Sequence, residues 1–368
     1  MRGQFLEAYK TPYKLRSVPL PTPSTPNDIL IKVDAASYCH TDFVLAEGQM
    51  PGFPKAFPHA SCHEFAGTVI SHFSSPSANA SAFRIGDKVG VPGRAFHACE
   101  TCFECQGSRD PVSQDDKGYS VYCVGAENNG ISKDGGFAEY ALVDARQLAP
   151  IPESMTAVET APLMCAGITI YAALKRCQLE PGQRVGIMGA GGGLGHLGLQ
   201  YAEKMGLRVL GVEAADGPLK LARSLNTSAR IVDARSENPV DVVRQLGAED
   251  RKKDLGEMGL DAVIMLPESQ AAFEYSMKLL KTHGKCVIVS FPEKGFHISA
   301  HDVVFRDISI IGSLVGSNRM LREMLNFSAE HNIRAIAKAF PLAKLNELVE
   351  EYHKGGGGKL VVDMSLQD

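Results

Sequence analysis

The sequence predicts an α/β protein in which a β-rich region precedes a doubly wound parallel sheet. From about residue 158 onward, short apolar runs typical of buried strands alternate with stretches of helical spacing, which is the pattern of βαβ units. Before that point, short apolar runs are separated by Pro and Gly, which indicates a folded-over sheet or barrel. The length of 368 residues allows about two domains.

The expected elements follow in chain order. The N-terminal part predicts strands at 29–33, 67–70 and 87–91. Residues 158–174 carry apolar side chains at spacings of three and four and predict one helix. The next part predicts a helix at 197–204 and strands at 183–188, 207–212, 229–233, 261–266, 285–290 and 308–311. The C-terminal part predicts helices from about 316 and at 342–353, a flexible glycine turn at 355–358 and a last strand at 359–363.

Composition argues against several classes of protein. The net charge is −4 and no Lys/Arg cluster stands out, so we expect no nucleic-acid partner. No apolar run reaches the roughly 18 residues of a membrane span, and the first residues lack the apolar run of a signal peptide. We therefore expect a cytoplasmic protein with no membrane partner. In a reducing compartment, clustered members of the nine cysteines are expected to bind metal rather than form disulfides.

A glycine-rich turn between an expected strand and an expected helix points to a dinucleotide. The turn runs from Gly189 to Gly195, and its tightest part is Gly192, Gly193, Leu194 and Gly195. Glycines there let the backbone approach a pyrophosphate at the N-terminus of the helix. Glu213 ends the next strand, where a carboxylate accepts hydrogen bonds from a ribose and repels a 2′-phosphate, which favours NAD(H) over NADP(H). The alternative is a tight turn with an incidental surface Glu.

A second motif is a cysteine cluster with metal-ligand spacing. Cys99, Cys102 and Cys105 form a C-x2-C-x2-C run, and Cys123 is the candidate fourth ligand after a polar insertion. Four thiolates are typical of a structural zinc site. An iron–sulfur cluster of the bacterial type would require a fourth Cys three residues on, followed by Pro, and that pattern is absent. Four thiols without a metal on a surface loop are the other alternative.

Three further residues suit an open catalytic zinc site. Cys39 and His63 each have polar neighbours in the sequence. Cys165 lies at the start of the expected helix that leads into the second region. Two thiolates and one imidazole leave a fourth position for water or substrate. The gaps between the three are too long for spacing alone to join them, so their conjunction with a dinucleotide fold carries the hypothesis. The remaining cysteines are assigned to packing: Cys62, Cys177 and Cys286.

With these motifs in place, the chain resembles the zinc-containing medium-chain alcohol dehydrogenases, and within them the yeast-type tetrameric branch. The matching stretches occur in family order and cover nearly the whole chain: CHTD, HE, GDKV, CxxCxxC, GGFAEYA, APLMCAGIT, GAGGGLGHLGLQYA, GLRVLGVE, GSLVG and KLVVD. The resemblance implies a GroES-like catalytic domain at 1–158, a Rossmann domain at 159–314 and a C-terminal segment at 315–368 that returns to the catalytic domain. It also implies two zinc ions per chain, NAD(H), and a homodimer or homotetramer.

The resemblance further implies residue roles. Cys39, His63 and Cys165 correspond to the catalytic zinc ligands, with Glu64 as an acid that can approach or replace the zinc water. Thr41 corresponds to the hydroxyl that takes the alcohol proton, and Asp42 to the acid that orients the His ligand. The cofactor contacts correspond to His40, Gly192, Gly193, Leu194, Gly195, Glu213, Ser313, Val315 and Lys359, the last in place of the family's usual Arg.

The implied activity is hydride transfer between an alcohol, aldehyde or ketone and NAD(H). Three departures qualify the resemblance: Val44 stands where the family often has a proton-relay His, Cys62 replaces a Gly, and an insertion precedes Cys123. Met50 and Gly93 lie near positions where small-alcohol enzymes tend to carry Trp, and the chain has no Trp, so we expect substrates larger than ethanol. The alternatives are a polyol-type dehydrogenase, a zinc-free reductase, and a non-catalytic or redox-sensing NAD(P)H-binding protein.

Overall fold

The computed structural model describes residues 1–107, 115 and 117–367, and the chain forms two compact units. The first unit contains Met1–Ile168, Gly316–Lys354 and Lys359–Asp368, and the second contains Thr169–Val315 and Gly355–Gly358. The sequence-based boundary lay after residue 158. The structure keeps the following ten residues with the first unit because the short helices at 157–164 pack on its sheet.

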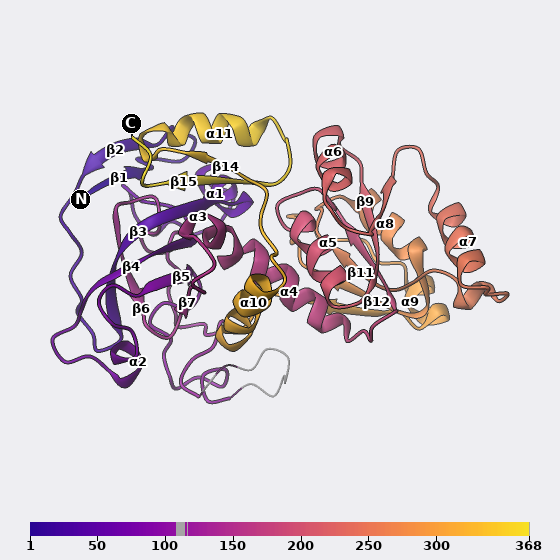
Figure 1. Cartoon of the computed structure of the whole chain (residues 1–368), viewed down its shortest axis with the longest axis horizontal. Helices are drawn as coiled ribbons and strands as arrows, with labels where there is room; N and C mark the ends of the chain where they lie inside the picture. Colours follow the sequence, from indigo (N-terminus) through magenta and orange to yellow (C-terminus); the bar gives the residue numbers. More distant parts are fainter. Residues whose placement is uncertain (108–114, 116, 368) are drawn as a thin grey trace. The chain divides into compact units, whose positions relative to one another are not determined.

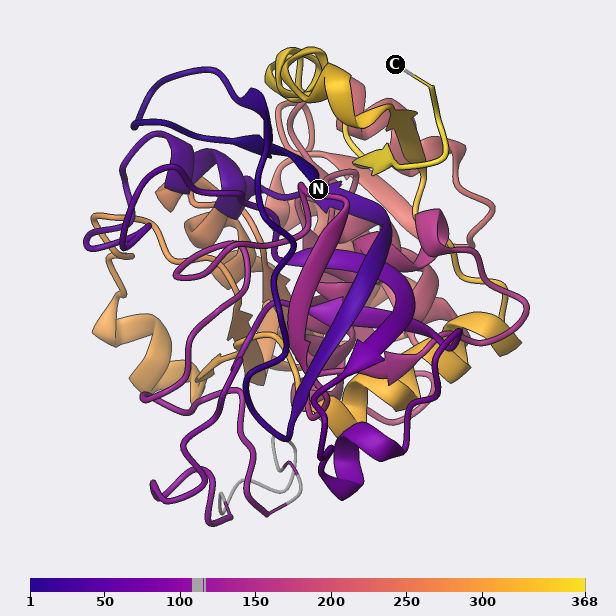
Figure 2. The same ribbon diagram turned by 90° about the vertical axis from the view of Figure 1, so that its left-hand side faces the viewer.

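The first unit is built on an antiparallel sheet, which faces the viewer in Figure 2. Its strand order is β14-β15-β3-β4-β5-β7, and β6 also pairs with β3. The bounds are β3 (Asp28–Tyr38), β4 (Glu64–His72), β5 (Lys88–Pro92), β6 (Tyr140–Asp144), β7 (Ala149–Pro150), β14 (Ala337–Phe340) and β15 (Lys359–Asp363). A separate hairpin pairs β1 (Arg2–Phe5) with β2 (Lys14–Ser17). The apolar runs predicted at 29–33, 67–70 and 87–91 thus lie in β3, β4 and β5.

The predicted helix whose residues pass from the first unit into the second is broken in the structure. Residues 158–174 were expected to form one helix, but α3 (Ala157–Thr160) and a 3-10 helix (Ala161–Met164) end before α4 (Ala166–Cys177) begins, with a bend of 50°. Pro162 lies in the first turn of the 3-10 helix and has no N–H to continue an α-helical ladder. The break leaves Cys165 between the two helices with non-helical backbone angles.

The other helices of the first unit are short or follow the second unit in sequence. Their bounds are α1 (His40–Ala46), α2 (Ala78–Ser81), α10 (Asn318–Glu330), a 3-10 helix (Leu342–Lys344) and α11 (Leu345–His353). The core of this unit collects apolar side chains from β3, β4 and β5 together with Leu345 and Leu348 of α11. The C-terminal segment is therefore part of this core (Figure 1).

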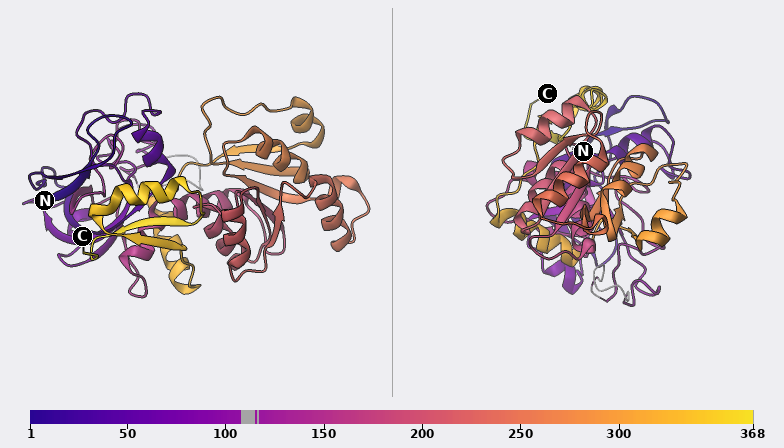
Figure 3. Two further views of the ribbon diagram at one scale, coloured as in Figure 1. Left: turned by 90° about the horizontal axis from the view of Figure 1, so that it is seen from above. Right: turned by 90° about the vertical axis from the view of Figure 1, so that its right-hand side faces the viewer.

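The second unit is a six-stranded parallel sheet with the strand order β10-β9-β8-β11-β12-β13. Its strands are β8 (Arg184–Met188), β9 (Arg208–Glu213), β10 (Arg230–Asp233), β11 (Leu260–Met265), β12 (Leu280–Ile288) and β13 (Ser309–Gly312). Its helices, which cover both faces of the sheet in Figure 3, are α5 (Gly195–Lys204), α6 (Asp216–Ser224), α7 (Pro239–Glu249), a 3-10 helix (Leu255–Glu257), α8 (Gln270–Leu279) and α9 (Ala300–Arg306). This order is that of the Rossmann fold, as predicted.

The apolar helices of the structure bury their side chains inside the protein. Across residues 1–107, 115 and 117–367, no single helix is long and apolar enough to cross a bilayer, and only the bent pair Ala157–Met164 and Ala166–Cys177 meets the length and composition criteria. Apolar side chains of that pair, such as Leu163, Ile170 and Tyr171, are buried in the protein.

Candidate active site

Cys39, His63 and Cys165 lie together in the first unit, and their candidate ligand atoms are all within 4.8 Å of one another. Cys39 follows β3 directly, His63 precedes β4 directly, and Cys165 lies at the helix break. Because β3 and β4 are antiparallel neighbours, the end of one strand and the start of the other meet at the same edge of the sheet. The fold thus joins three residues that sequence spacing could not connect.

Asp42 ties together the two turns that carry Cys39 and His63. Its carboxylate is fully buried and accepts hydrogen bonds from the backbone N–H groups of Cys39 and Cys62, both at 2.9 Å. The first of these bonds also caps the N-terminus of α1. The carboxylate lies 3.8 Å from Nδ1 of His63, which is too long for a hydrogen bond. Asp42 therefore fixes the backbone of both turns, and its role in orienting the imidazole stays a prediction.

The turn before His63 has an unusual backbone. Cys62 has a φ of +79°, which residues other than glycine rarely adopt. Its thiol donates to the carbonyl oxygens of Ser37 and Glu64, at 3.3 Å each. Gly130 and Gly135 pack against the same peptide, and a Cβ at either would lie about 2 Å from the Cys62 carbonyl oxygen. Glycine adopts a positive φ without strain, which is consistent with the Gly that the resemblance implied at this position. The fully buried Cys62 is a packing residue, as expected.

The three candidate ligands shift one another's pKa values. The Cys165 thiol hydrogen-bonds to Cys39, which lowers the pKa of Cys39 and raises the pKa of Cys165. Burial lowers the pKa of His63, but the negative charges of Cys39 and Asp42 outweigh it and hold that pKa above its ordinary value. A buried group of two sulfurs and an imidazole with this much negative potential is suited to a cation.

Glu64 lies in a buried ion pair beside the same group. Its Oε1 contacts Nζ of Lys359 and accepts a hydrogen bond from Ser37 Oγ at 2.8 Å. Burial raises the pKa of Glu64, and the charge of Lys359 opposes that rise. The Lys359 ammonium also donates to the Tyr38 carbonyl at 2.9 Å, because β15 pairs with the end of β3. Lys359 was expected to bind a cofactor phosphate; the structure places its ammonium beside Glu64, and a phosphate contact stays a prediction.

Two neighbours of Cys39 face different surroundings. Thr41 Oγ1 lies 3.8 Å from the Cys39 sulfur, so its hydroxyl is beside the candidate metal position. His40 is exposed, and its Nδ1 lies 2.7 Å from the hydroxyl of Tyr352 in α11. Val44 follows one turn later on α1 and carries no group that could accept a proton.

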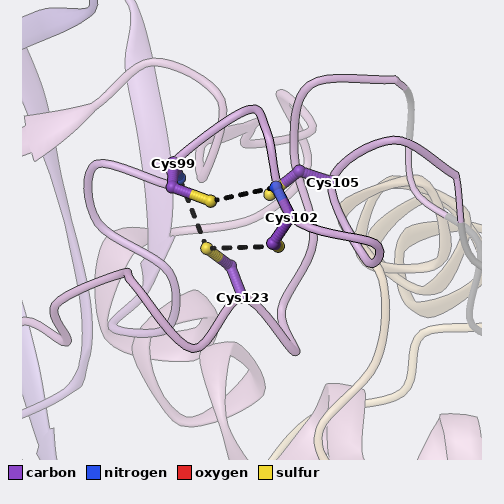
Figure 4. Close-up of side chains that lie close together, drawn as sticks. All are labelled: Cys99, Cys102, Cys105 and Cys123. Carbon is purple, nitrogen blue, oxygen red and sulfur yellow. Dashed lines mark hydrogen bonds between the residues drawn. The ribbon is translucent and has the colours of Figure 1, made fainter.

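The four cysteines of the spacing motif form a second cluster, shown in Figure 4. The sulfurs of Cys99, Cys102, Cys105 and Cys123 all lie within 4.8 Å of one another. The Cys102 and Cys123 sulfurs are 4.0 Å apart, close to the roughly 3.8 Å expected between two sulfurs on one tetrahedral zinc. Cys123 thus reaches the cluster despite the insertion, of which residues 108–114 and 116 lie outside the described part of the chain.

The glycine-rich turn lies in the second unit between β8 and α5. A Cβ at Gly191 would lie 1.8 Å from the Pro218 carbonyl oxygen, and one at Gly195 would lie 2.1 Å from that of Gly189, so packing requires both glycines. A Cβ at Gly192 would meet only the Gly189 carbonyl oxygen, at 3.3 Å. The Gly192 surface is therefore open for a ligand to approach the backbone.

Glu213 lies next to this turn at the end of β9. Its carboxylate accepts hydrogen bonds from the backbone N–H groups of Gly191, Ala214 and Ala215 at 3.1, 2.8 and 3.2 Å. These bonds hold the acid beside the turn, and a contact with a ribose stays a prediction. The run Gly355–Gly358 also reaches this region, where the Gly358 N–H donates to the Gly191 carbonyl at 3.2 Å.

Ser313 and Val315 follow β13, the last strand of the same sheet. The Ser313 hydroxyl is enclosed without a hydrogen-bond partner among the described residues. Val315 has φ of +45°, an outlier for a β-branched residue. Strain of this kind concentrates at functional sites, which agrees with the role that the resemblance implied.

Comparison with known proteins identifies the family. Residues 25–153 match the alcohol dehydrogenase GroES-like domain, and residues 193–330 match the zinc-binding dehydrogenase domain. An alcohol dehydrogenase of Geobacillus stearothermophilus is 33% identical over 355 residues, which are 96% of this chain and 97% of that protein. The chain belongs to the zinc-containing medium-chain alcohol dehydrogenase family.

Other members of this alcohol dehydrogenase family agree over the full length. An alcohol dehydrogenase of Moraxella sp. (strain TAE123) is 32% identical over 367 residues, or 100% of both chains. The crystal structure of the alcohol dehydrogenase from the hyperthermophilic archaeon Aeropyrum pernix superposes with a TM-score of 0.82 at 27% identity, covering 99% of this chain and 100% of that one. The inferred family, its two folds and the enzyme class are confirmed; the yeast-type branch stays a prediction.

Both cysteine-containing groups fit the zinc of this dehydrogenase family. Four sulfurs around one point match a closed structural site, and the Cys39, His63 and Cys165 set leaves a fourth position open. His63 Nδ1 is buried and has no hydrogen-bond partner among the described residues. A buried imidazole nitrogen without a partner is consistent with a histidine ring that is held in its orientation only when a metal is bound.

Two residues near the dehydrogenase site were not singled out by their sequence pattern. Ser37 lies on β3, and Cys39 directly follows that strand two residues later. The alternation of side chains along a strand could have placed both on one face. Arg94 follows Gly93, and no sequence signal marked it.

The expectation at Gly93 needs a correction. A Cβ there would lie 2.5 Å from the Asn129 carbonyl oxygen and 2.6 Å from the His63 Cβ. Gly93 is a packing position, so the absence of Trp from it says nothing about pocket width.

Proposed function

We propose that the chain catalyses reversible hydride transfer between an alcohol and its aldehyde or ketone, with NAD(H) as the hydride partner. The observation that carries this proposal is the convergence of Cys39, His63 and Cys165 with the Thr41 hydroxyl 3.8 Å from the Cys39 sulfur. The relatives named as alcohol dehydrogenases support it over the full chain length.

The site residues divide the work of the reaction. Cys39, His63 and Cys165 would hold a zinc ion, which would supply a Lewis acid that lowers the pKa of an alcohol hydroxyl and polarises a carbonyl. Thr41 Oγ1 takes the alcohol proton in oxidation and returns it in reduction. Because Val44 accepts no proton, the proton on Thr41 would leave either through the cofactor ribose to solvent or through another base. Asp42 keeps the ligand turns in place through its two backbone bonds.

Cofactor choice falls to the second unit. The open backbone at Gly192 and the N-terminus of α5 suit a pyrophosphate, and the Glu213 carboxylate suits a ribose hydroxyl while repelling a 2′-phosphate. We infer that NAD(H) is preferred over NADP(H). We also infer substrates larger than ethanol, because the chain has no Trp to narrow a pocket. Met50, and not Gly93, is the position at which the absence of Trp supports this inference.

The test is a panel of alcohols and aldehydes with NAD(H) and NADP(H), read by nicotinamide absorbance at about 340 nm, together with metal analysis. We expect turnover with NAD(H) and about two zinc ions per chain. A zinc-loaded protein that binds NADH but turns over no member of the panel would instead support a non-catalytic binding protein. A strict preference for ethanol would contradict the inference on substrate size.

We propose that the protein is a homo-oligomer and that it works in the cytoplasm. β13 is an edge strand of the parallel sheet, and Val304 and Phe305 of the neighbouring α9 are 70% and 75% exposed. An exposed strand edge beside large apolar side chains suits pairing with a second copy of the chain. Nine free cysteines suit a reducing compartment. Light scattering should give at least a dimer for the wild type and a lower mass for Phe305→Glu.

A further inference from the structure

Arg94 carries a guanidinium charge with no acidic partner in the described part of the chain. Its Nη2 donates to the Val121 carbonyl at 2.8 Å, and its Nε is enclosed without any acceptor. The side chain as a whole keeps partial exposure, so small molecules are not shut out. The proposed mechanism gives this residue no role.

Two other enclosed arginines are each paired with two carboxylates. Arg146 bonds to Asp144 and Glu100, and Arg184 bonds to Asp250 and Glu249. Two carboxylates meet each of these guanidinium groups, whereas one neutral carbonyl meets that of Arg94. Burying a charge without an opposite charge is unfavourable. Among the residues that the structure describes, Arg94 therefore lacks the anionic partner that Arg146 and Arg184 both have.

The backbone places Arg94 directly after a residue that contacts His63, one of the candidate zinc ligands. The preceding Gly93 donates its N–H to the His63 carbonyl at 2.7 Å and packs against the His63 side chain. Burial lowers the pKa of Arg94, and the neighbouring Tyr119, Tyr122 and Cys165 oppose that shift. The uncompensated charge is thus carried by a segment that is held against a candidate zinc ligand.

We propose that Arg94 binds an anionic group of the substrate, so that the enzyme acts on alcohols or aldehydes that also carry a carboxylate or a phosphate. The guanidinium fork matches both groups in geometry and charge. This inference rests on the proposed function and adds the substrate class. The opposing view is that Arg94 only supports the Val121 segment through its single hydrogen bond.

The first experiment compares matched substrates on the wild-type holoenzyme. We would measure kcat/KM for 1-butanol, 4-hydroxybutanoate and 4-hydroxybutyl phosphate with NAD⁺. We expect one of the two anionic substrates to exceed 1-butanol by about 10- to 100-fold, as for a hydrogen bond to a charged group. The better of the two identifies the anion. Equal values for all three, or a preference for 1-butanol, would overturn the inference and leave the proposed function standing.

The second experiment removes the charge. Arg94→Met should lower the ratio of kcat/KM for the anionic over the neutral substrate by about 10-fold or more, and Arg94→Lys should keep part of the preference. Arg322→Met removes an exposed charge on α10 of the same unit and should leave the ratio unchanged. An unchanged ratio in folded, zinc-loaded Arg94→Met would assign Arg94 to support of the Val121 segment.

A third measurement needs no variant and stands if Arg94→Met fails to fold. Butanoate should inhibit 1-butanol oxidation by the wild type at a concentration about 10-fold lower than butanamide does. Equal inhibition would overturn the inference. If neither neutral nor anionic alcohols are turned over, the proposed function itself fails, which separates the two failures.

Discussion

Removing the ammonium of Lys359 should destabilise the first unit more as the pH rises. The Glu64 carboxylate is 0% exposed, and its counter-charge, Lys359, is 6% exposed. Among the described residues, only Ser37 Oγ and the Ala166 N–H would remain as partners, at 2.8 and 3.4 Å. Breaking a buried pair by removing one partner costs about 3–5 kcal/mol. Lys359→Met, which keeps most of the apolar stem, should approach this loss of unfolding free energy above about pH 8.

The sign of the pH dependence follows from Glu64. Burial raises its pKa in the folded protein, and loss of Lys359 raises that pKa further. The folded state then holds a proton that the unfolded chain releases near its ordinary pKa, so stability falls as the pH rises between those two values. Near pH 5, where Glu64 is protonated, the loss should shrink to about 1 kcal/mol. Bound zinc should reduce it as well, since the ion supplies nearby positive charge.

The assay is urea unfolding followed by far-UV circular dichroism, with zinc-loaded and zinc-stripped protein. In a double-mutant cycle with Glu64→Gln, the two changes together should cost at least about 1.5 kcal/mol less than their sum. Lys338→Met removes an exposed lysine whose partner is Glu351 and should cost less than about 1 kcal/mol. Additive costs within about 0.5 kcal/mol, or a loss that does not depend on pH, would refute the reasoning.

Three further predictions follow from the same structure. Glu213→Gln should raise the ratio of kcat/KM for NADP⁺ over NAD⁺ by about 10-fold or more, because it removes the charge that repels a 2′-phosphate; an unchanged ratio speaks against this role. Val44→His should extend alcohol oxidation to lower pH by supplying a base, and an identical pH–rate profile would contradict the proposed proton route. After zinc removal, iodoacetamide at pH 7 should label Cys99 before Cys105, as read by peptide mass spectrometry. Backbone hydrogen bonds from Thr101 and Cys102 lower the pKa of Cys99 to about 6, whereas burial raises that of Cys105 to about 12; equal labelling would contradict this.

The elements that sequence reasoning located correctly are those whose signals are local. Apolar runs bounded by turn residues marked β3, β4 and the strands of the parallel sheet, and the glycine turn marked the start of α5. The cysteine spacing marked the four-sulfur cluster because its ligands are mostly neighbours in the chain. Such signals depend on only a few adjacent residues, so a single sequence contains them.

The features that sequence reasoning missed depend on contacts between distant segments. The break before Cys165 lies within a region of unbroken helical spacing, and Pro162 was the only local sign of it. The pairing of Lys359 with Glu64 requires β15 to return beside β3, which no periodicity encodes. Arg94 is notable only because an acidic partner is missing around it, and that absence is a property of the fold.

The return of β15 to the first sheet has a consequence for biosynthesis. Cys39, His63 and Cys165 all leave the ribosome long before Lys359, and the second unit, whose main segment is Thr169–Val315, is also complete before it. Domains generally fold as units during synthesis, N-terminal ones first, but here the N-terminal unit must wait for its last strand. A nascent chain can therefore collect its metal ligands while Glu64 still lacks its counter-charge, and zinc captured at that stage would act as a temporary substitute for Lys359. Metal supply during translation would then influence how much of the protein reaches its finished form.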